Sequence, residues 1–203
     1  MYQLPSLSYL YQDLEPFIDT HTMGLHYHKH EQAYLNNLNN LLKKNNYDYK
    51  YNLNELIYHI EEFSIDNREN ILFNLGGVLN HNIYWKSMNK NNTLPSGKLK
   101  EQIDKQFGSY DEFWEKIKEN ALKLKGSGYT FLVMSNNELE IINFFNQDSP
   151  LLYGYIPLFN IDLWEHAYYI NYENDKSKYI DNFKEIADFS YANEIYNKNA
   201  QNF

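Results

Sequence analysis

Cysteine is absent from this 203-residue chain. A protein without cysteine has no disulfide framework and no thiolate metal site, so any bound metal must be held by His, Asp and Glu. Long apolar runs are missing too, since no stretch approaches the roughly 18 residues that a membrane span needs. The opening Met1–Pro5 has no basic-then-apolar signal character. We therefore expect a cytoplasmic protein without a membrane partner.

Positive charge is scarce: 18 Lys and Arg face 27 Asp and Glu, which gives a net charge of −9. This balance provides no electrostatic footprint for nucleic acid or an anionic membrane surface. The chain is rich in apolar residues, with 43% hydrophobic and 17% aromatic residues. That content is enough for a core in one large domain or two small ones.

The first half has helical periodicity. His26, His30 and Tyr34 follow one another at steps of four residues, which places them on one helix face beside an apolar stripe of Leu35, Leu38 and Leu42. Asp66 and Glu69 have the spacing of a capping box, which predicts a second helix to about Met88. Two such helices joined by a loop form an αα-hairpin.

The second half has a mixed pattern. The polar stretch 89–97 contains Pro95 and Gly97, so we divide the chain into an N-terminal α-hairpin domain, 1–92, and a C-terminal α/β domain, 93–203. A capping box at 109–112 begins a helix, and the β-forming runs 129–134 and 139–145 flank an Asn-Asn turn. A third run, 156–161, precedes further helices after residue 163 and around 178–189. The expected fold class is α+β, with a small three-stranded antiparallel sheet.

The stretch Asp162-Leu-Trp-Glu-His166-Ala-Tyr-Tyr169 carries the most information. It puts a carboxylate and an imidazole one helical turn apart behind an apolar strand, a spacing that suits two ligands of one metal. Taken with the His-rich segment 23–34 and with Gly-Gly-Val-Leu-Asn-His-Asn-Ile-Tyr-Trp at 76–85, it resembles the iron/manganese superoxide dismutase family. The resemblance extends from residue 2 to about residue 191.

The resemblance implies a ligand set and a reaction. The matching positions are His26, His81, Asp162 and His166, which would hold one manganese or iron ion per chain. Three imidazoles and one carboxylate suit manganese, iron or zinc, and the spacing alone does not choose among them. The implied reaction converts superoxide to dioxygen and hydrogen peroxide. The three other histidines outside the motif's functional positions, His21, His28 and His59, are expected at the surface.

The resemblance also implies residues around the metal. Gln147 stands where manganese forms place an amide near the metal, whereas iron forms usually supply it from the position of Gly77. We therefore expect a manganese preference. Tyr34 matches a gateway tyrosine that relays protons, His30 matches its companion in the substrate channel, and the indoles of Trp85 and Trp164 match aromatic walls of the site.

Glu165 and Tyr169 point to an assembly. Adjacent helix residues project about 100° apart, so the Glu165 carboxylate cannot aim at the metal that His166 binds. In the family this glutamate reaches the metal-ligating histidine of a second subunit, here His166, and Tyr169 pairs with the partner's His30. We expect a homodimer, with a tetramer left open.

Several positions depart from the family pattern. Tyr129 replaces a common tryptophan, with Phe131 two residues on. Glu31 replaces a frequent histidine, and Lys176 replaces an arginine that helps to steer anions, so Lys29 and Lys176 are left to attract the substrate.

Two other functions fit part of the pattern. One is a non-catalytic metal-binding member of the same fold, which would need the ligands but not Tyr34, His30 and Gln147. The other is a non-haem iron oxygenase with two histidines and Asp162 as a facial triad, which leaves the fourth ligand, His166, unexplained.

Overall fold

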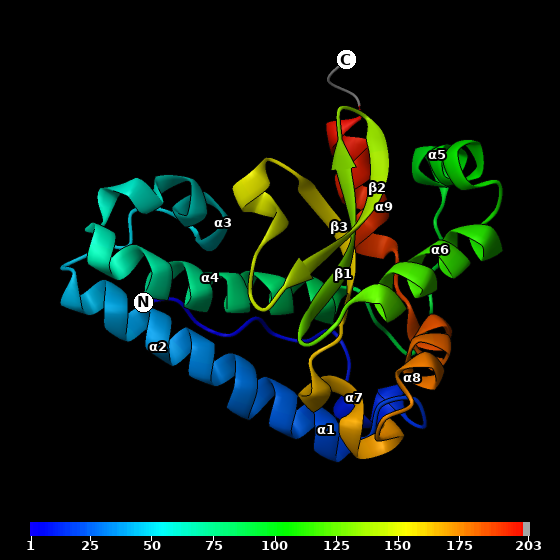
Figure 1. The fold of residues 1–203 in the computed structure, drawn as a ribbon, viewed down its shortest axis with the longest axis horizontal. Coiled ribbons are helices and arrows are strands. Elements are labelled where there is room, and N and C mark those ends of the chain that lie inside the picture. The colour runs from blue at the N-terminus through cyan, green and yellow to red at the C-terminus, as the bar shows by residue number, and fades with distance from the viewer. Residues whose placement is uncertain (201–203) are drawn as a thin grey trace.

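The computed structural model describes residues 1–200. Its first half is helical, and α2 and α4 lie side by side as a long hairpin (Figure 1). The elements, with η for 3₁₀ or π turns, are η1 Tyr11–Leu14, α1 Thr20–Leu25, η2 His26–Glu31, α2 Gln32–Lys44, α3 Leu53–Leu56, η3 Ile57–Glu62 and α4 Ile65–Lys86.

An apolar core holds the hairpin together. Leu35, Leu38 and Leu42 from α2 pack with Leu75 and Leu79 from α4, and all five side chains are buried. The leucine stripe of the sequence is therefore the inner face of α2, as expected from its spacing.

The second half combines helices with a three-stranded sheet (Figure 1). Its elements are α5 Gly97–Phe107, α6 Tyr110–Lys123, β1 Gly128–Ser135, β2 Glu138–Phe145, η4 Pro150–Tyr153, β3 Ile156–Asp162, α7 Glu165–Tyr172, α8 Lys176–Phe183, η5 Lys184–Ile186 and α9 Ser190–Asn199. The strand order is β2-β1-β3 and both pairings are antiparallel. The expected α+β fold class is confirmed.

The β1–β2 turn follows from its sequence. Asn136 and Asn137 have φ values of 48° and 65°, a left-handed pair that asparagine tolerates and that a two-residue hairpin requires. Ser109 is the N-cap of α6, because its hydroxyl accepts the backbone N–H of Glu112 at 3.2 Å; the Glu112 carboxylate accepts from the same hydroxyl at 3.0 Å, so the reciprocal half of the expected capping box is missing.

The largest core joins the two halves. Leu14, Met23 and Trp85 from the first half pack with Trp114 and Phe159 from the second. α4 extends from the hairpin to the sheet, so its C-terminal part lies at the junction (Figure 1). Residues from both halves can therefore reach one point.

Two expectations about local structure need correction. The helix through His26 contains a π turn over 26–31, so the regular four-residue step is broken there. The capping box at Asp66 is wrong: α4 has Ser64 as its N-cap, and Asp66 lies in the first turn, where a carboxylate still favours the positive end of the helix dipole.

Within residues 1–200, none of the helices combines the length and the apolar character that crossing a membrane requires.

Candidate metal centre

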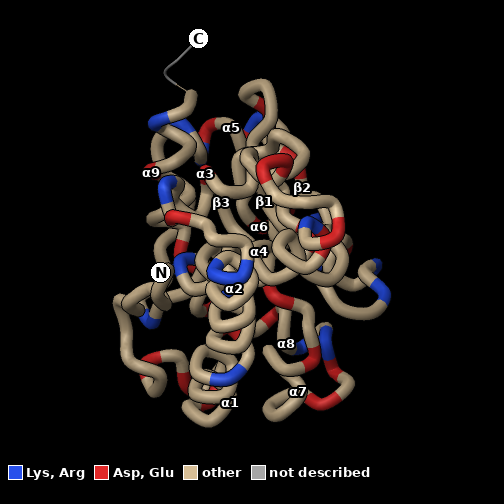
Figure 2. Tube along the Cα trace, turned by 90° about the vertical axis from the view of Figure 1, so that its left-hand side faces the viewer, with Lys and Arg blue, Asp and Glu red and all other residues tan. Residues whose placement is uncertain are grey.

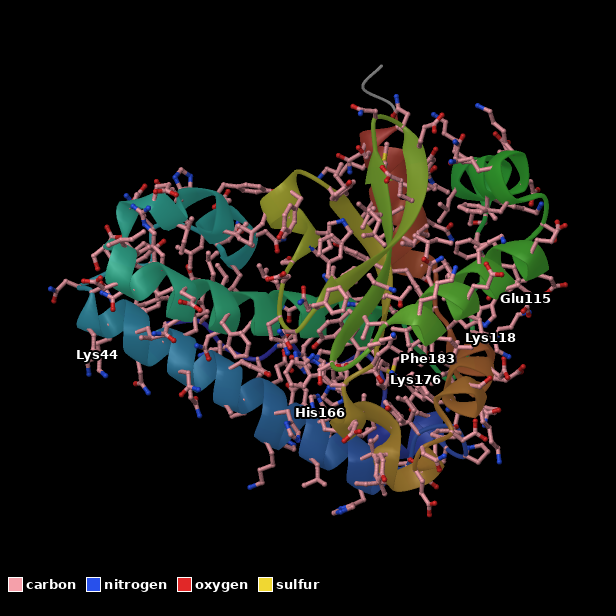
Figure 3. The ribbon with its side chains drawn as sticks, in the orientation of Figure 1. Lys44, Glu115, Lys118, His166, Lys176 and Phe183 are labelled. Carbon is pink, nitrogen blue, oxygen red and sulfur yellow. The ribbon has the colours of Figure 1, made fainter. Side chains whose placement is uncertain are left out.

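Four side chains from four separate elements meet at the junction. His26 begins η2, His81 lies in α4 and Asp162 ends β3. His166 lies in the first turn of α7 (Figure 3). Each offers one ligand atom, and these atoms all lie within 4.8 Å of one another. The distances from Asp162 Oδ2 to the Nε2 atoms are 3.2 Å for His26, 3.9 Å for His81 and 3.8 Å for His166.

The facing atoms have no hydrogen-bond partner among the described residues. This holds for Nε2 of all three histidines and for Oδ2 of Asp162. Their opposite atoms are engaged in two cases: His81 Nδ1 donates to the Gly77 carbonyl at 2.5 Å, and Asp162 Oδ1 accepts the Trp164 N–H at 2.8 Å. Buried polar atoms without partners are costly, and a cation among them removes that cost. The donor set therefore fits one metal ion.

Burial also sets the charge of the ligands. Loss of solvent lowers the pKa of His26 well below its usual range, and it lowers the pKa of His81 to about 3 and that of His166 to about 2. Burial raises the pKa of Asp162. The imidazoles are thus neutral at physiological pH, which is the form that binds a metal.

A second polar pair lies beside the ligands. Gln147 Nε2 donates to the Tyr34 hydroxyl at 3.1 Å, and the Tyr34 ring centroid is 5.7 Å from that of His81. A Cβ added at Gly77 would lie 2.6 Å from Tyr34 Cγ. The absence of a side chain at Gly77 therefore leaves space for the Tyr34 ring. The hydroxyl of that ring accepts the hydrogen bond from the Gln147 amide.

Sequence reasoning missed two residues that support Gln147. Asn80 Nδ2 donates to the Asp148 carbonyl at 3.0 Å and lies 3.5 Å from Gln147 Oε1. A Cβ added at Gly76 would collide with the Gln147 carbonyl. No local pattern in the sequence marks either contact, although Gly76 and Asn80 are four residues apart and so share one face of α4.

Aromatic rings surround the ligands. His30 stacks on His166 with centroids 3.9 Å apart, and Trp164 lies 5.6 Å from His166. The Trp85 ring is 4.9 Å from His26 and 6.0 Å from His81. The Trp85 and Trp164 rings therefore lie beside the ligands, and their role in excluding water stays a prediction.

Two departures from the family pattern border the site. Tyr129 is fully buried, and its hydroxyl is 3.5 Å from His81 Nδ1, so the apolar shell is kept with a changed polar contact. Glu31 is fully buried as well, and its Oε2 accepts the Trp85 indole N–H at 2.7 Å. Burial raises the pKa of Glu31 to about 8.

Glu165 and Tyr169 lie outside the cluster. Both are exposed on α7, Tyr169 at 49%, and the Glu165 carboxylate makes no ion pair or hydrogen bond with the described residues.

Lys176, at the start of α8, is partly buried and lies near α7 (Figure 3). His21 and His28 are exposed, as expected, whereas His59 is half-buried and stacks on Tyr51 with ring centroids 3.7 Å apart. Acidic residues colour much of the α7–α8 segment, whereas blue lysine bands mark the α1–α2 side (Figure 2).

Comparison with known proteins gives a consistent result. The sequence model described as "Iron/manganese superoxide dismutases, alpha-hairpin domain" matches residues 1–89, and that of the "C-terminal domain" matches residues 95–195. A protein of Buchnera aphidicola named superoxide dismutase [Mn] is 41% identical and aligns with 94% of this chain and 96% of its own length. Proteins of the same name from Listeria innocua and Thermus aquaticus are each 37% identical and align with 96% of this chain and 97% of their own length. The chain belongs to the iron/manganese superoxide dismutase family.

Proposed function

We propose that this chain is a superoxide dismutase that uses one manganese ion, held by His26, His81, Asp162 and His166. The observation that carries this proposal is the convergence of four buried donor atoms without other partners. A bound manganese ion supplies the one-electron couple that oxidises one superoxide to dioxygen and reduces a second to hydrogen peroxide. The protein residues fix the donors, exclude water and deliver protons.

Proton delivery is assigned to Tyr34 and Gln147. The Gln147 amide donates to the Tyr34 hydroxyl, which leaves the Tyr34 proton free to pass toward the site. Burial raises the pKa of Tyr34, so the phenol keeps its proton at neutral pH. His30, half-buried against His166, forms the neighbouring part of the substrate channel. A storage protein would need the four donors but not this pair.

The metal preference is assigned to manganese. Gln147 supplies the amide from the loop after β2, and the Tyr34 ring fills the space above Gly77, so an amide cannot come from position 77. The three relatives described above are named superoxide dismutase [Mn]. Reconstitution with manganese should give higher specific activity than reconstitution with iron.

Metal analysis and a superoxide-consumption assay on the same sample test the function. The proposal expects one manganese or iron ion per chain and activity that rises with metal content. A protein that retains metal without consuming superoxide would instead be a binding module.

The assembly is proposed as a homodimer through α7. Glu165 and Tyr169 are exposed beside His166. In the proposed dimer Glu165 contacts the partner's His166, and Tyr169 contacts the partner's His30.

The division of the chain into two domains at 92/93 and the cytoplasmic location also stay proposals. Limited proteolysis and cell fractionation would test them.

A further inference from the structure

One buried hydrogen bond joins the two elements that carry His26 and His81. The Trp85 indole N–H donates to Oε2 of Glu31 at 2.7 Å, and the two residues are 4% and 0% exposed. Glu31 is the last residue of η2, which begins at His26, and Trp85 lies one helical turn after His81 in α4. The bond therefore connects η2 with α4 beside the ligands.

The Trp85 ring packs on both of these ligands. Its centroid lies 4.9 Å from that of His26 and 6.0 Å from that of His81. The N–H is the one polar group of an indole, and a buried N–H without an acceptor is costly, so its partner fixes how the ring is rotated. The orientation of the surface against which both imidazoles pack thus depends on where the acceptor lies.

Among the described residues, the Trp85 indole is the hydrogen-bond partner of the Glu31 carboxyl group. The second carboxyl oxygen, Oε1, is buried without a partner there. Burial raises the pKa of Glu31 to about 8, so at neutral pH the group is the neutral acid, whose carbonyl oxygen still accepts a hydrogen bond. A polar group buried with a single contact costs stability, which indicates that the contact has a role beyond packing.

Tyr9 contacts the same tryptophan in a different way. Its hydroxyl donates to the Trp85 carbonyl at 3.0 Å, and the residue is 8% exposed. This bond holds the main chain of α4, whereas the bond from Glu31 holds the ring. The two buried hydrogen bonds can therefore be removed separately.

We propose that Glu31 is a positioning residue, which holds the Trp85 indole against His26 and His81 and so keeps these two donors at the spacing that one metal ion needs. The inference rests on the proposed function, because it concerns the proposed metal centre. With the bond in place, the four donor atoms lie within 4.8 Å of one another. Without it the ring is free to rotate and η2 loses this polar link to α4, so the chain should still fold but hold the metal less tightly.

The test compares Glu31→Leu with Glu31→Gln in the manganese-loaded full chain. Leucine removes the acceptor, whereas glutamine keeps a carbonyl oxygen in the same place. The quantity measured is the rate at which manganese passes to an excess of chelator. Loss of a group that orients a ligand typically weakens metal binding by about 10- to 100-fold, and Glu31 acts through one intervening ring, so Glu31→Leu should release manganese about tenfold faster. Glu31→Gln should release it at a rate close to that of the wild type.

Two further variants separate the position of the ring from general stability. Trp85→Phe removes the N–H and keeps an aromatic ring, so it breaks the same bond from the other side and serves if Glu31→Leu does not fold. It should speed release, and adding Glu31→Leu to it should change the rate little, because the bond is already gone. Tyr9→Phe is the matched control: it removes a buried hydrogen bond to Trp85 without touching the indole. It should lower the free energy of unfolding and leave the release rate unchanged.

The positioning role is overturned if Glu31→Leu or Trp85→Phe releases manganese at the wild-type rate, or if Glu31→Gln releases it as fast as Glu31→Leu. Equally fast release from Tyr9→Phe would also overturn it, because the effect would then be a general loss of stability. Superoxide consumption by the same samples tests the proposed function separately. A wild type that binds manganese without consuming superoxide would refute that function and leave the role of Glu31 in metal binding intact.

Discussion

The metal centre has two sides that differ in how completely one chain builds them. On the inner side, His81 and Asp162 are fully buried, and each has its second polar atom bonded to the main chain. On the outer side, α7 presents His166 with its side chain 13% exposed, next to the exposed Glu165 and Tyr169. The inner side is therefore held by contacts within the chain, whereas the outer side carries the exposed Glu165 and Tyr169, which the proposed dimer would bring to a partner.

The difference between the two sides follows from the secondary-structure elements that carry the residues. α4 contributes buried side chains to three apolar clusters, and residues 157–162 of β3 are all buried, so their side chains have little freedom. α7 is an eight-residue helix with one face at the surface. Ligand geometry on the inner side should therefore survive in a monomer, while the outer side should depend on assembly.

The largest effect should come from breaking the inner side at a ligand. His81→Ala removes one donor and leaves the other three facing an incomplete site, so metal retention and superoxide consumption should both be lost. Metal analysis and the activity assay check this. His21→Ala, which changes an exposed histidine, should leave both unchanged. Full activity in metal-free His81→Ala would contradict the ligand assignment.

The next effect should come from filling the space above Gly77. A Cβ there meets the Tyr34 ring, and such overpacking typically costs about 1–3 kcal/mol. Gly77→Ala should therefore lower the free energy of unfolding and displace the Tyr34 hydroxyl from Gln147. Denaturant unfolding measures the first change. Gly24→Ala is the matched control, because a Cβ at this helical position has nothing within 4 Å and should be neutral or stabilising.

The outer side is tested by Glu165→Ala. Removing a group that orients a metal ligand typically lowers metal affinity or activity by about 10- to 100-fold. We expect a loss in that range together with weaker dimerisation, measured by analytical ultracentrifugation. Glu101→Ala, an exposed change on α5, should affect neither. A fully active wild-type monomer at micromolar concentration would remove the basis for the comparison.

The smallest change in structure should come from Tyr34→Phe. The ring still fills the space beside Gly77, so stability and metal content should stay nearly unchanged. Loss of the hydroxyl breaks the Gln147 contact and should lower turnover or alter product inhibition at high superoxide flux. Stopped-flow kinetics across flux and pH provide the measurement, with Tyr58→Phe as the exposed control. Wild-type kinetics throughout would make Tyr34 a packing residue only.

The sequence predicted the parts of the fold that periodicity and turn chemistry determine. The α2 leucine stripe, the hairpin around Asn136 and Asn137, and the strand that ends at Asp162 are confirmed. The π turn over 26–31 was not predicted, because the four-residue steps from His26 to His30 and Tyr34 also fit a regular α-helix. α5, whose first residue is Gly97, was also missed, since Pro and Gly there indicated only a boundary.

The site was predictable from motifs, and its supporting contacts were not. His26, His81, Asp162 and His166 were identified through the resemblance, and the structure brings their donor atoms together. The contacts of Asn80 and Gly76 with the Gln147 segment depend on how closely α4 approaches the loop after β2. How closely α4 approaches this loop depends on packing between segments that are far apart in the chain. No local sequence pattern reveals that packing.

The most direct test of the central claim is anomalous diffraction at the manganese edge from crystals of the manganese-loaded protein. The account predicts one strong peak per chain, enclosed by Nε2 of His26, His81 and His166 and by Oδ2 of Asp162. A manganese peak at any other residues, or none at this junction in protein that consumes superoxide, would contradict it.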